Sequence, residues 1–292
     1  MKNNYFSFVG LGVMGYPMAG HLSKLPHTQM RVYNRTPKRA LNWLDSYQGT
    51  SAPTPKEAVE DADFVMVCVG NDRDLEDVIL GPDGVLAGLK PGAVVVDHTT
   101  VATSTAIRIG ERVEAKGAYF LDAPVSGGQA GAENGKLTIM VGGNADAFAR
   151  VRPYLEDSYG LKVTHMGPLG AGQTTKMVNQ ICIAGTLQGL AEALNFGMHA
   201  GLDMDKVLDV ISKGAAGSWQ MENRGKTMVR DQFDFGFALD WMIKDLNNTV
   251  EEGEALSADL TVTRQILDYY RELSARGLGR MDTSALIKRI TE

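Results

Sequence analysis

The chain has 292 residues, of which 44% are hydrophobic and 22% are charged, and these proportions are typical of globular proteins and exclude general disorder. Lysine and arginine number 29 against 35 aspartates and glutamates, and the resulting net charge of −6 gives no electrostatic reason to expect binding to nucleic acid or to an anionic membrane. The two cysteines, Cys68 and Cys182, are too few and too far apart to predict a disulfide framework or a metal site, so we expect a cytoplasmic protein.

Short apolar runs alternate with helical stretches over the first 165 residues or so. The beginning of the chain is typical of a first strand and not of an export signal, and no run approaches the roughly 18 apolar residues of a membrane span. Several runs lack polar alternation, which is typical of strands covered on both faces. This pattern predicts a doubly wound α/β domain. The expected strands are residues 5–9, 30–33, 64–69, 93–96, 119–122, 137–141 and 162–164, with early helices at 16–25 and 37–47.

The pattern becomes entirely helical after Gly172. Residues 173–200 contain no proline and predict one helix about 40 Å long, at about 1.5 Å per residue, that could connect two domains. We therefore predict an N-terminal domain over residues 1–165 and an all-α domain over 166–292 that serves substrate binding and assembly into a homodimer or homotetramer. Further helices are expected at residues 204–212, 219–228, 238–258 and 262–276.

A glycine-rich loop follows the first predicted strand directly and opens a predicted helix. Its sequence is G-L-G-V-M-G, with Gly10, Gly12 and Gly15 at the spacing of the dinucleotide fingerprint and Val13 and Met14 between them. Glycines permit the tight turn and the approach of a pyrophosphate to bare backbone, and the helix N-terminus favours its negative charge. This context indicates a Rossmann-type cofactor domain.

The end of the second strand indicates which dinucleotide binds. An acidic residue normally stands there in proteins that bind the ribose of NAD, whereas this chain has Asn34, Arg35 and Thr36, followed by Lys38 and Arg39. An amide, a hydroxyl and a guanidinium can bind the 2′-phosphate of NADP, which a carboxylate would repel. Basic residues near a helix start are otherwise unfavourable. NADP is therefore the favoured cofactor, with NAD as a weaker alternative.

Four ordered sequence blocks resemble those of the β-hydroxyacid dehydrogenase family. They are residues 8–19 around the glycine-rich loop, 122–128 (DAPVSGG), 170–179 (GAGQTTKMVN) and 237–246, which contains Lys244 and Asp245. The resemblance covers almost the whole chain. It implies an oxidoreductase that transfers a hydride between NADP(H) and a small, carboxylate-bearing β-hydroxyacid or its semialdehyde.

The resemblance implies a role for individual residues. Lys176 would be the general acid or base, and Asn179, one turn later on the same helical face, could hold the substrate hydroxyl or the lysine. We expect His98 to be a spacer beside the cofactor. The candidate substrate-side residues are Ser126, Gly127, Gly128, Asn179, Trp219, Phe237 and Asp245, of which Trp219 and Phe237 could equally be ordinary core. Beyond the loop and strand residues already named, the candidate cofactor-side residues are Val69, Thr100 and Lys244.

Three other readings of the sequence remain. An imine reductase would share the architecture and the cofactor but typically lacks a lysine at position 176. A non-catalytic NADP-binding interaction module should have lost Lys176 or the Ser126 loop, and a nucleotide-binding methyltransferase would need neither Lys176 nor Lys244. The residues do not identify the substrate, because one methylene in a pocket changes binding by only about 1 to 3 kcal/mol. No cluster of residues has metal-ligand spacing, so no metal is expected.

Overall fold

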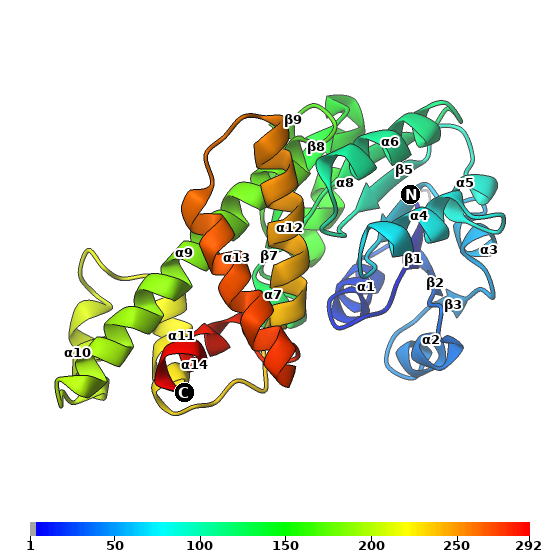
Figure 1. The fold of residues 1–292 in the computed structure, drawn as a ribbon. Coiled ribbons are helices and arrows are strands. Elements are labelled where there is room, and N and C mark those ends of the chain that lie inside the picture. Colours follow the sequence, from blue (N-terminus) through cyan, green and yellow to red (C-terminus); the bar gives the residue numbers. More distant parts are fainter. Residues whose placement is uncertain (1–3) are drawn as a thin grey trace. The chain divides into compact units, whose positions relative to one another are not determined.

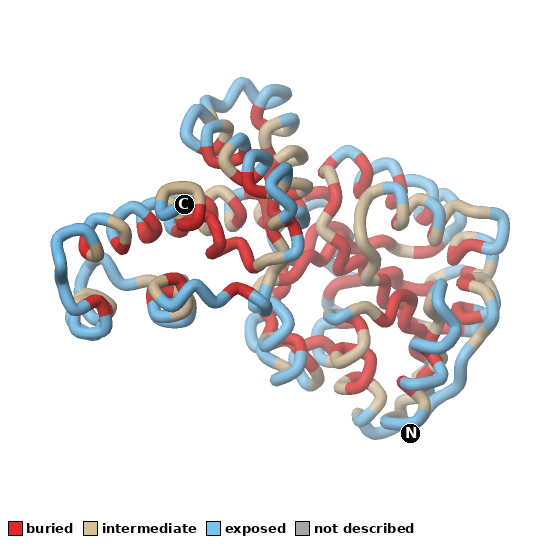
Figure 2. The backbone as a smooth tube through the Cα atoms, turned by 60° about the horizontal axis from the view of Figure 1, so that its bottom comes forward, coloured by how far each residue is buried: buried red, intermediate tan, exposed pale blue. Residues whose placement is uncertain are grey.

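The computed structural model describes residues 4–292 and divides into two compact units, Met1–Lys176 and Met177–Glu292 (Figure 1). Each unit has buried residues of its own that form hydrophobic clusters (Figure 2). The expectation of a doubly wound α/β unit followed by a helical unit is confirmed.

The first unit is built on a nine-stranded sheet with the order β3-β2-β1-β4-β5-β6-β8-β7, in which β9 also pairs with β8. The strands from β3 to β6 are parallel, whereas β8 runs antiparallel to β6 and to β7. The sheet is therefore mixed at one end, which the apolar runs did not predict. The strands are β1 (Asn4–Val9), β2 (Thr28–Tyr33), β3 (Thr50–Ser51), β4 (Phe64–Val67), β5 (Val94–Asp97), β6 (Tyr119–Asp122), β7 (Val125–Ser126), β8 (Leu137–Gly143) and β9 (Gly160–Gly167).

Two separate hydrophobic clusters cover the two faces of this sheet. Successive side chains of a strand point to opposite faces, so Phe64 and Met66 of β4 join one cluster and Val65 and Val67 join the other. This division explains the uninterrupted apolar runs. The covering helices are α1 (Gly15–Ser23), α2 (Pro37–Leu44), α3 (Pro55–Val59), α4 (Asp72–Leu80), α5 (Val85–Gly88), α6 (Thr103–Glu114), α7 (Gly128–Glu133) and α8 (Ala145–Ser158).

The long helix α9 (Ala171–His199) begins in the first unit and continues into the second. The other helices of the second unit are α10 (Met204–Ile211), α11 (Trp219–Val229), α12 (Leu239–Ala255), α13 (Thr261–Leu273), a π-turn (Ser274–Leu278), a 3-10 helix (Thr283–Ile287) and α14 (Lys288–Thr291). Helices α12 and α13 pack against each other (Figure 1). Both end three residues before their expected ends, α12 because Ser257 takes a positive φ of 56° and α13 because the chain turns into a π-turn. No helix among residues 4–292 is long and apolar enough to cross a membrane.

Candidate functional site

The glycine-rich loop between β1 and α1 presents bare backbone to the outside. Gly10 has a φ of 99°, and a Cβ there would overlap the carbonyl oxygen of Cys68, so only glycine fits. A Cβ on Gly12 would meet nothing within 4 Å. Gly12 and Val13 are among the residues that line a cleft of about 620 Å³. This arrangement fits a dinucleotide pyrophosphate, which needs close approach to the backbone at a helix N-terminus.

Asn34 at the end of β2 holds this loop in place. Its side-chain oxygen accepts a hydrogen bond from Leu11 N–H at 2.9 Å, and its amide nitrogen donates to the carbonyl of Thr36 at 3.1 Å. An aspartate could accept the first bond but could not donate the second. Arg35 is 82% exposed and pairs with Asp74 at 2.7 Å. Because exposed ion pairs contribute little, this pairing leaves Arg35 able to turn toward a phosphate.

The loops that follow β4 and β5 are joined to each other. Val69 N–H donates to the hydroxyl of Thr99 at 3.1 Å, and Thr99 N–H donates to the carboxylate of Asp97 at 2.9 Å. The structure therefore brings Val69 beside the segment that carries Thr100. Both loops lie at the carboxyl ends of parallel strands, the edge at which open α/β sheets bind ligands.

The segment with Ser126 makes a tight turn between β7 and α7. Ser126 is half-buried, while Gly127 and Gly128 are exposed and have φ values of 130° and 61°. Residues with a side chain rarely adopt such φ angles, so the backbone conformation of this turn requires glycine at both positions. The turn contains a serine hydroxyl and the backbone N–H groups of two glycines, and groups of this kind can donate to a carboxylate.

His98 is a buried structural residue. One ring nitrogen donates to the carbonyl of Ala123 at 2.7 Å, and the other accepts from the hydroxyl of Tyr159 at 2.8 Å. Because a carbonyl oxygen only accepts, Nδ1 carries the hydrogen, and in the neutral ring Nε2 is the acceptor. Burial lowers the pKa of His98 to about 4, against the opposing effect of the bond to Ala123. The side chain therefore bonds to the start of the Ser126 segment and is uncharged at neutral pH.

Asp122, the last residue of β6, anchors the N-terminus of α9. Its two carboxylate oxygens accept hydrogen bonds of 2.8 Å from the backbone N–H groups of Gly170 and Gln173. A Cβ on Gly172 would overlap the Asp122 carbonyl, so glycine permits this close approach. Burial raises the pKa of Asp122 to about 6, while its backbone hydrogen bonds act in the opposite direction. Lys176 follows on the same helix and is only 7% exposed.

A polar network in the second unit connects three of the predicted residues. Asn179 donates through its amide to Gln180 at 2.7 Å, and Gln180 donates to Asp245 at 2.7 Å. The ammonium of Lys244 lies 3.2 Å from the other oxygen of Asp245. Gln180 was not singled out by sequence, although it directly follows Asn179 and stands four residues after Lys176, which places it on the same helical face.

The two aromatic candidates are in different settings. Trp219, the first residue of α11, is 54% exposed with the guanidinium of Arg224 5.0 Å from its ring centre, so it is not part of the core. Phe237 is half-buried at the edge of the core of the second unit, and its N–H donates to the buried carboxylate of Asp282 at 2.9 Å.

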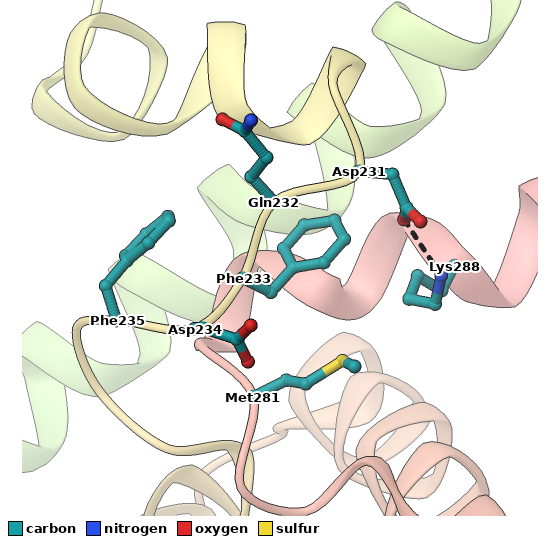
Figure 3. Close-up of a pocket in the computed structure, with 7 residues that line it drawn as sticks. All are labelled: Asp231, Gln232, Phe233, Asp234, Phe235, Met281 and Lys288. Atoms are coloured by element: carbon teal, nitrogen blue, oxygen red, sulfur yellow. Dashed lines mark hydrogen bonds and ion pairs between the residues drawn. The ribbon is translucent and has the colours of Figure 1, made fainter.

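A second hollow, of about 380 Å³, lies in the helical unit (Figure 3). Its lining includes Phe233, Phe235 and Met281, together with Lys288, whose ammonium is 2.8 Å from the carboxylate of Asp231. The hydrogen bond to Asp231 is the main cause that raises the pKa of Lys288. None of the predicted site residues lines this hollow. Within residues 4–292, no group of three or more histidine, cysteine, aspartate or glutamate side chains could hold a metal ion.

Comparison with known proteins relates both units to nicotinamide-dependent enzymes. Residues 5–167 match the NAD binding domain of 6-phosphogluconate dehydrogenase, and residues 170–290 match the NAD-binding family of NADP-dependent 3-hydroxyisobutyrate dehydrogenase. An uncharacterized oxidoreductase of Shewanella frigidimarina is 52% identical over 97% of both chains. The 2-hydroxy-3-oxopropionate reductase of Escherichia coli is 34% identical over 96% of this chain and 95% of its own.

A solved structure agrees with these sequence matches. The 3-hydroxyisobutyrate dehydrogenase of Mycobacterium tuberculosis, solved with L-serine, is similar with a TM-score of 0.89 and 28% identity. The similarity covers 99% of this chain and all of the other. The likeness therefore extends over both units and not over the cofactor fold only.

Proposed function

The chain belongs to the β-hydroxyacid dehydrogenase family, and from that premise we propose that it interconverts small β-hydroxyacids and their semialdehydes with NADP(H) as the preferred cofactor. The family membership makes it an NAD(P)-dependent hydroxyacid dehydrogenase that uses a nicotinamide dinucleotide. The choice of NADP, the role of Lys176 and the class of substrate are the proposal.

The observation that carries the proposal is the setting of Lys176. Its side chain is nearly buried, and its helix is anchored at the N-terminus by the Asp122 carboxylate. A lysine that served only to solvate a helix face would extend into water. A buried ammonium on an anchored helix is instead typical of a group that must meet a substrate at a defined place.

In the proposed reaction, Lys176 transfers the proton to and from the substrate oxygen. When bound, the nicotinamide supplies the hydride for carbonyl reduction or accepts it in the reverse direction. Lys176 donates a proton from Nζ to the carbonyl oxygen during reduction and removes the hydroxyl proton during oxidation. Asn179, three residues later, is proposed to hold the substrate oxygen or the lysine.

The remaining polar residues account for substrate binding. Ser126, with the backbone N–H groups of Gly127 and Gly128, is proposed to bind the substrate carboxylate. Asp245 is proposed to face the substrate, with Lys244 on the cofactor side. These groups suit a short chain that carries an acid at one end and an aldehyde or hydroxyl near the other.

The cofactor preference rests on the end of β2. Asn34, Arg35 and Thr36 present an amide, a guanidinium and a hydroxyl where an acid would select NAD. Residues 170–290 match the family described as NAD-binding of NADP-dependent 3-hydroxyisobutyrate dehydrogenase, and the NADP dependence of that enzyme supports the same preference.

We further propose that residues 1–165 bind the cofactor, and that residues 166–292 serve substrate binding and self-association into a dimer or tetramer. Light scattering coupled to size-exclusion chromatography measures the assembly directly. A mass that matches one chain at micromolar concentration would contradict the self-association.

One experiment tests the proposed activity. The protein is assayed by NADPH and NADH absorbance against a panel of small semialdehydes, with glyoxylate included, and against 3-hydroxyisobutyrate and serine in reverse. We expect reduction of at least one acid-bearing aldehyde, with higher kcat/KM for NADPH. Turnover of cyclic imines with no turnover of any carbonyl substrate would contradict the proposal.

A further inference from the structure

We propose that Gln173 is a positioning residue whose side-chain amide ties the backbone on both sides of Thr100 to the first turn of α9, and so fixes Lys176 relative to the cofactor-side loop. The inference rests on the proposed role of Lys176 as the proton donor. In this role Gln173 affects the reaction without contacting either the substrate or the cofactor.

The two ends of the Gln173 amide have separate partners. Its nitrogen donates to the carbonyl of Thr99 at 2.7 Å, and its oxygen accepts from the N–H of Val101 at 3.2 Å. The side chain is fully buried. Because the two bonded groups flank Thr100, one planar amide fixes the backbone before and after that residue.

The backbone of Gln173 is fixed as well. Its N–H donates to one oxygen of the Asp122 carboxylate, and the N–H of Gly170 donates to the other, both at 2.8 Å. A Cβ on Gly172 would overlap the backbone carbonyls of Asp122 and Met140. The first turn of α9 is therefore held by charge-assisted bonds and by close backbone packing, and it has little freedom to shift.

This fixed turn connects the cofactor-side loops to the lysine. Lys176 stands three residues after Gln173, on the same side of the helix. Thr99, which accepts the Gln173 bond at its carbonyl, also accepts the N–H of Val69 at its hydroxyl. The amide thereby joins the loops after β4 and β5 to the helix that carries the proposed acid.

Positioning of this kind has a measurable consequence. A displacement of about 1 Å can cost on the order of 100-fold in rate, so loss of the amide should lower kcat while the cofactor still binds. We expect Gln173→Met, which keeps the length of the side chain, to lower kcat by about 10- to 100-fold. The Kd of NADPH, measured by fluorescence without substrate, should change by less than about threefold. The control is Gln188→Met on the same helix, where the amide bonds only to Glu192.

A double-mutant cycle separates positioning from general structural damage. In a Lys176→Met background, Gln173→Met should have almost no further effect on kcat, because residues that act through one group are non-additive. An equal fold-loss in both backgrounds would overturn the inference. If Lys176→Met keeps the turnover of the unmodified enzyme, the proposed function fails first, and the positioning role falls with it. The two failures are thus distinguishable.

A measurement without cofactor or substrate directly tests the two hydrogen bonds of the Gln173 side-chain amide. Hydrogen exchange at the Val101 amide, measured on the cofactor-free protein, should be at least about tenfold faster in Gln173→Met, because a lost hydrogen bond exposes that N–H to local opening. Exchange in the Gln188→Met control should equal that of the unmodified protein. Unchanged exchange at Val101 in Gln173→Met would overturn the inference whatever the kinetics.

Gln173→Glu gives an independent variant if Gln173→Met does not fold. A protonated glutamic acid has one donor and one acceptor and can replace the amide, whereas the carboxylate cannot donate to Thr99. Its kcat relative to the unmodified enzyme should therefore rise as pH falls from 8 to 6. The neighbouring carboxyls, Asp122 and Asp97, are common to both enzymes. A ratio of kcat values that stays constant or falls as pH is lowered would contradict the positioning role of the Gln173 amide.

Discussion

The side-chain amide of Gln180 donates a 2.7 Å hydrogen bond to Asp245, a carboxylate 65 residues further along the chain that is only 2% exposed. The second oxygen of Asp245 lies 3.2 Å from the ammonium of Lys244. A buried carboxylate is stable only when its oxygens have such partners. Gln180 therefore helps to hold the Asp245 side chain in place within the helical unit.

Replacing Gln180 by leucine should destabilise the protein measurably. The change removes a donor to a buried charge, and we expect a loss of about 1.5 to 3 kcal/mol in the free energy of unfolding, measured by urea titration. Gln188→Leu on the same helix is the control and should stay within about 0.5 kcal/mol, because its partner Glu192 is near the surface. Equal losses for both variants would show that the bond from Gln180 to Asp245 contributes no more to stability than the bond from Gln188 to Glu192.

The preference for NADPH should depend on Arg35. Arg35→Ala removes a charge-assisted bond to the 2′-phosphate, which is worth about 1.5 to 3 kcal/mol, and should raise the KM for NADPH by about 10- to 100-fold. The KM for NADH should hardly change, because NADH lacks that phosphate. Arg73→Ala is the control, since Arg73 is also an exposed arginine with an aspartate partner, Asp77. Equal kcat/KM for the two cofactors in the unmodified enzyme would contradict the preference itself.

The strands of the first unit were predictable from the sequence to different degrees. The apolar run at residues 64–69 predicted a buried strand because both faces of the sheet are covered. The antiparallel end was not predictable, because β7 has only two residues and its pairing is set by tertiary contacts.

The candidate site residues stand out in the sequence as motifs, but the hydrogen-bond networks around them do not. Asp122, Gln173 and Gln180 all lie in or beside the family-like blocks, yet each of them has a hydrogen-bond partner 48 to 74 residues away. Sequence spacing carries no information on such bonds. The sequence also did not show whether Trp219 is buried. Aromatic side chains generally favour core positions, but Trp219 is exposed.

The Ser126 turn should affect the substrate and not the cofactor. Ser126→Ala removes a hydroxyl donor to the proposed substrate carboxylate, and we expect KM for the substrate to rise by about 10-fold or more. The Kd of NADPH, measured without substrate, should stay unchanged. Ser104→Ala on α6, an exposed serine, is the control. A parallel loss of NADPH affinity would assign the turn to the cofactor.

The pH dependence of stability should carry the signature of His98. Its pKa is about 4 in the folded protein against 6.5 when exposed. Between these two pH values, His98 is therefore protonated in the unfolded chain and neutral in the folded protein. The stability from this group is fully present above pH 6.5 and is lost as pH falls through 4. Between pH 7 and 5 the loss should be about 2 kcal/mol.

His98→Gln keeps a donor for Ala123 and an acceptor for Tyr159 but does not titrate. Urea unfolding of both proteins at pH 7 and pH 5 should show the larger loss in the unmodified protein. The raised pKa of Asp122 acts with the opposite sign but is common to both proteins and cancels in the difference. A difference that does not change with pH would contradict the buried, neutral state of His98.

Lys176 should determine the chemical step. Lys176→Met preserves much of the length of the side chain but removes the proton donor, and we expect kcat to fall by about 100- to 10,000-fold, the usual contribution of general acid–base catalysis. NADPH affinity and thermal stability should remain close to those of the unmodified enzyme. Lys176→Arg should not restore turnover, because a guanidinium does not release its proton at neutral pH. The control is Lys162→Met, which changes an exposed lysine on β9. A Lys176→Met enzyme that kept more than half of the turnover of the unmodified protein would remove Lys176 from the mechanism and leave the proton without a source among the residues proposed for it.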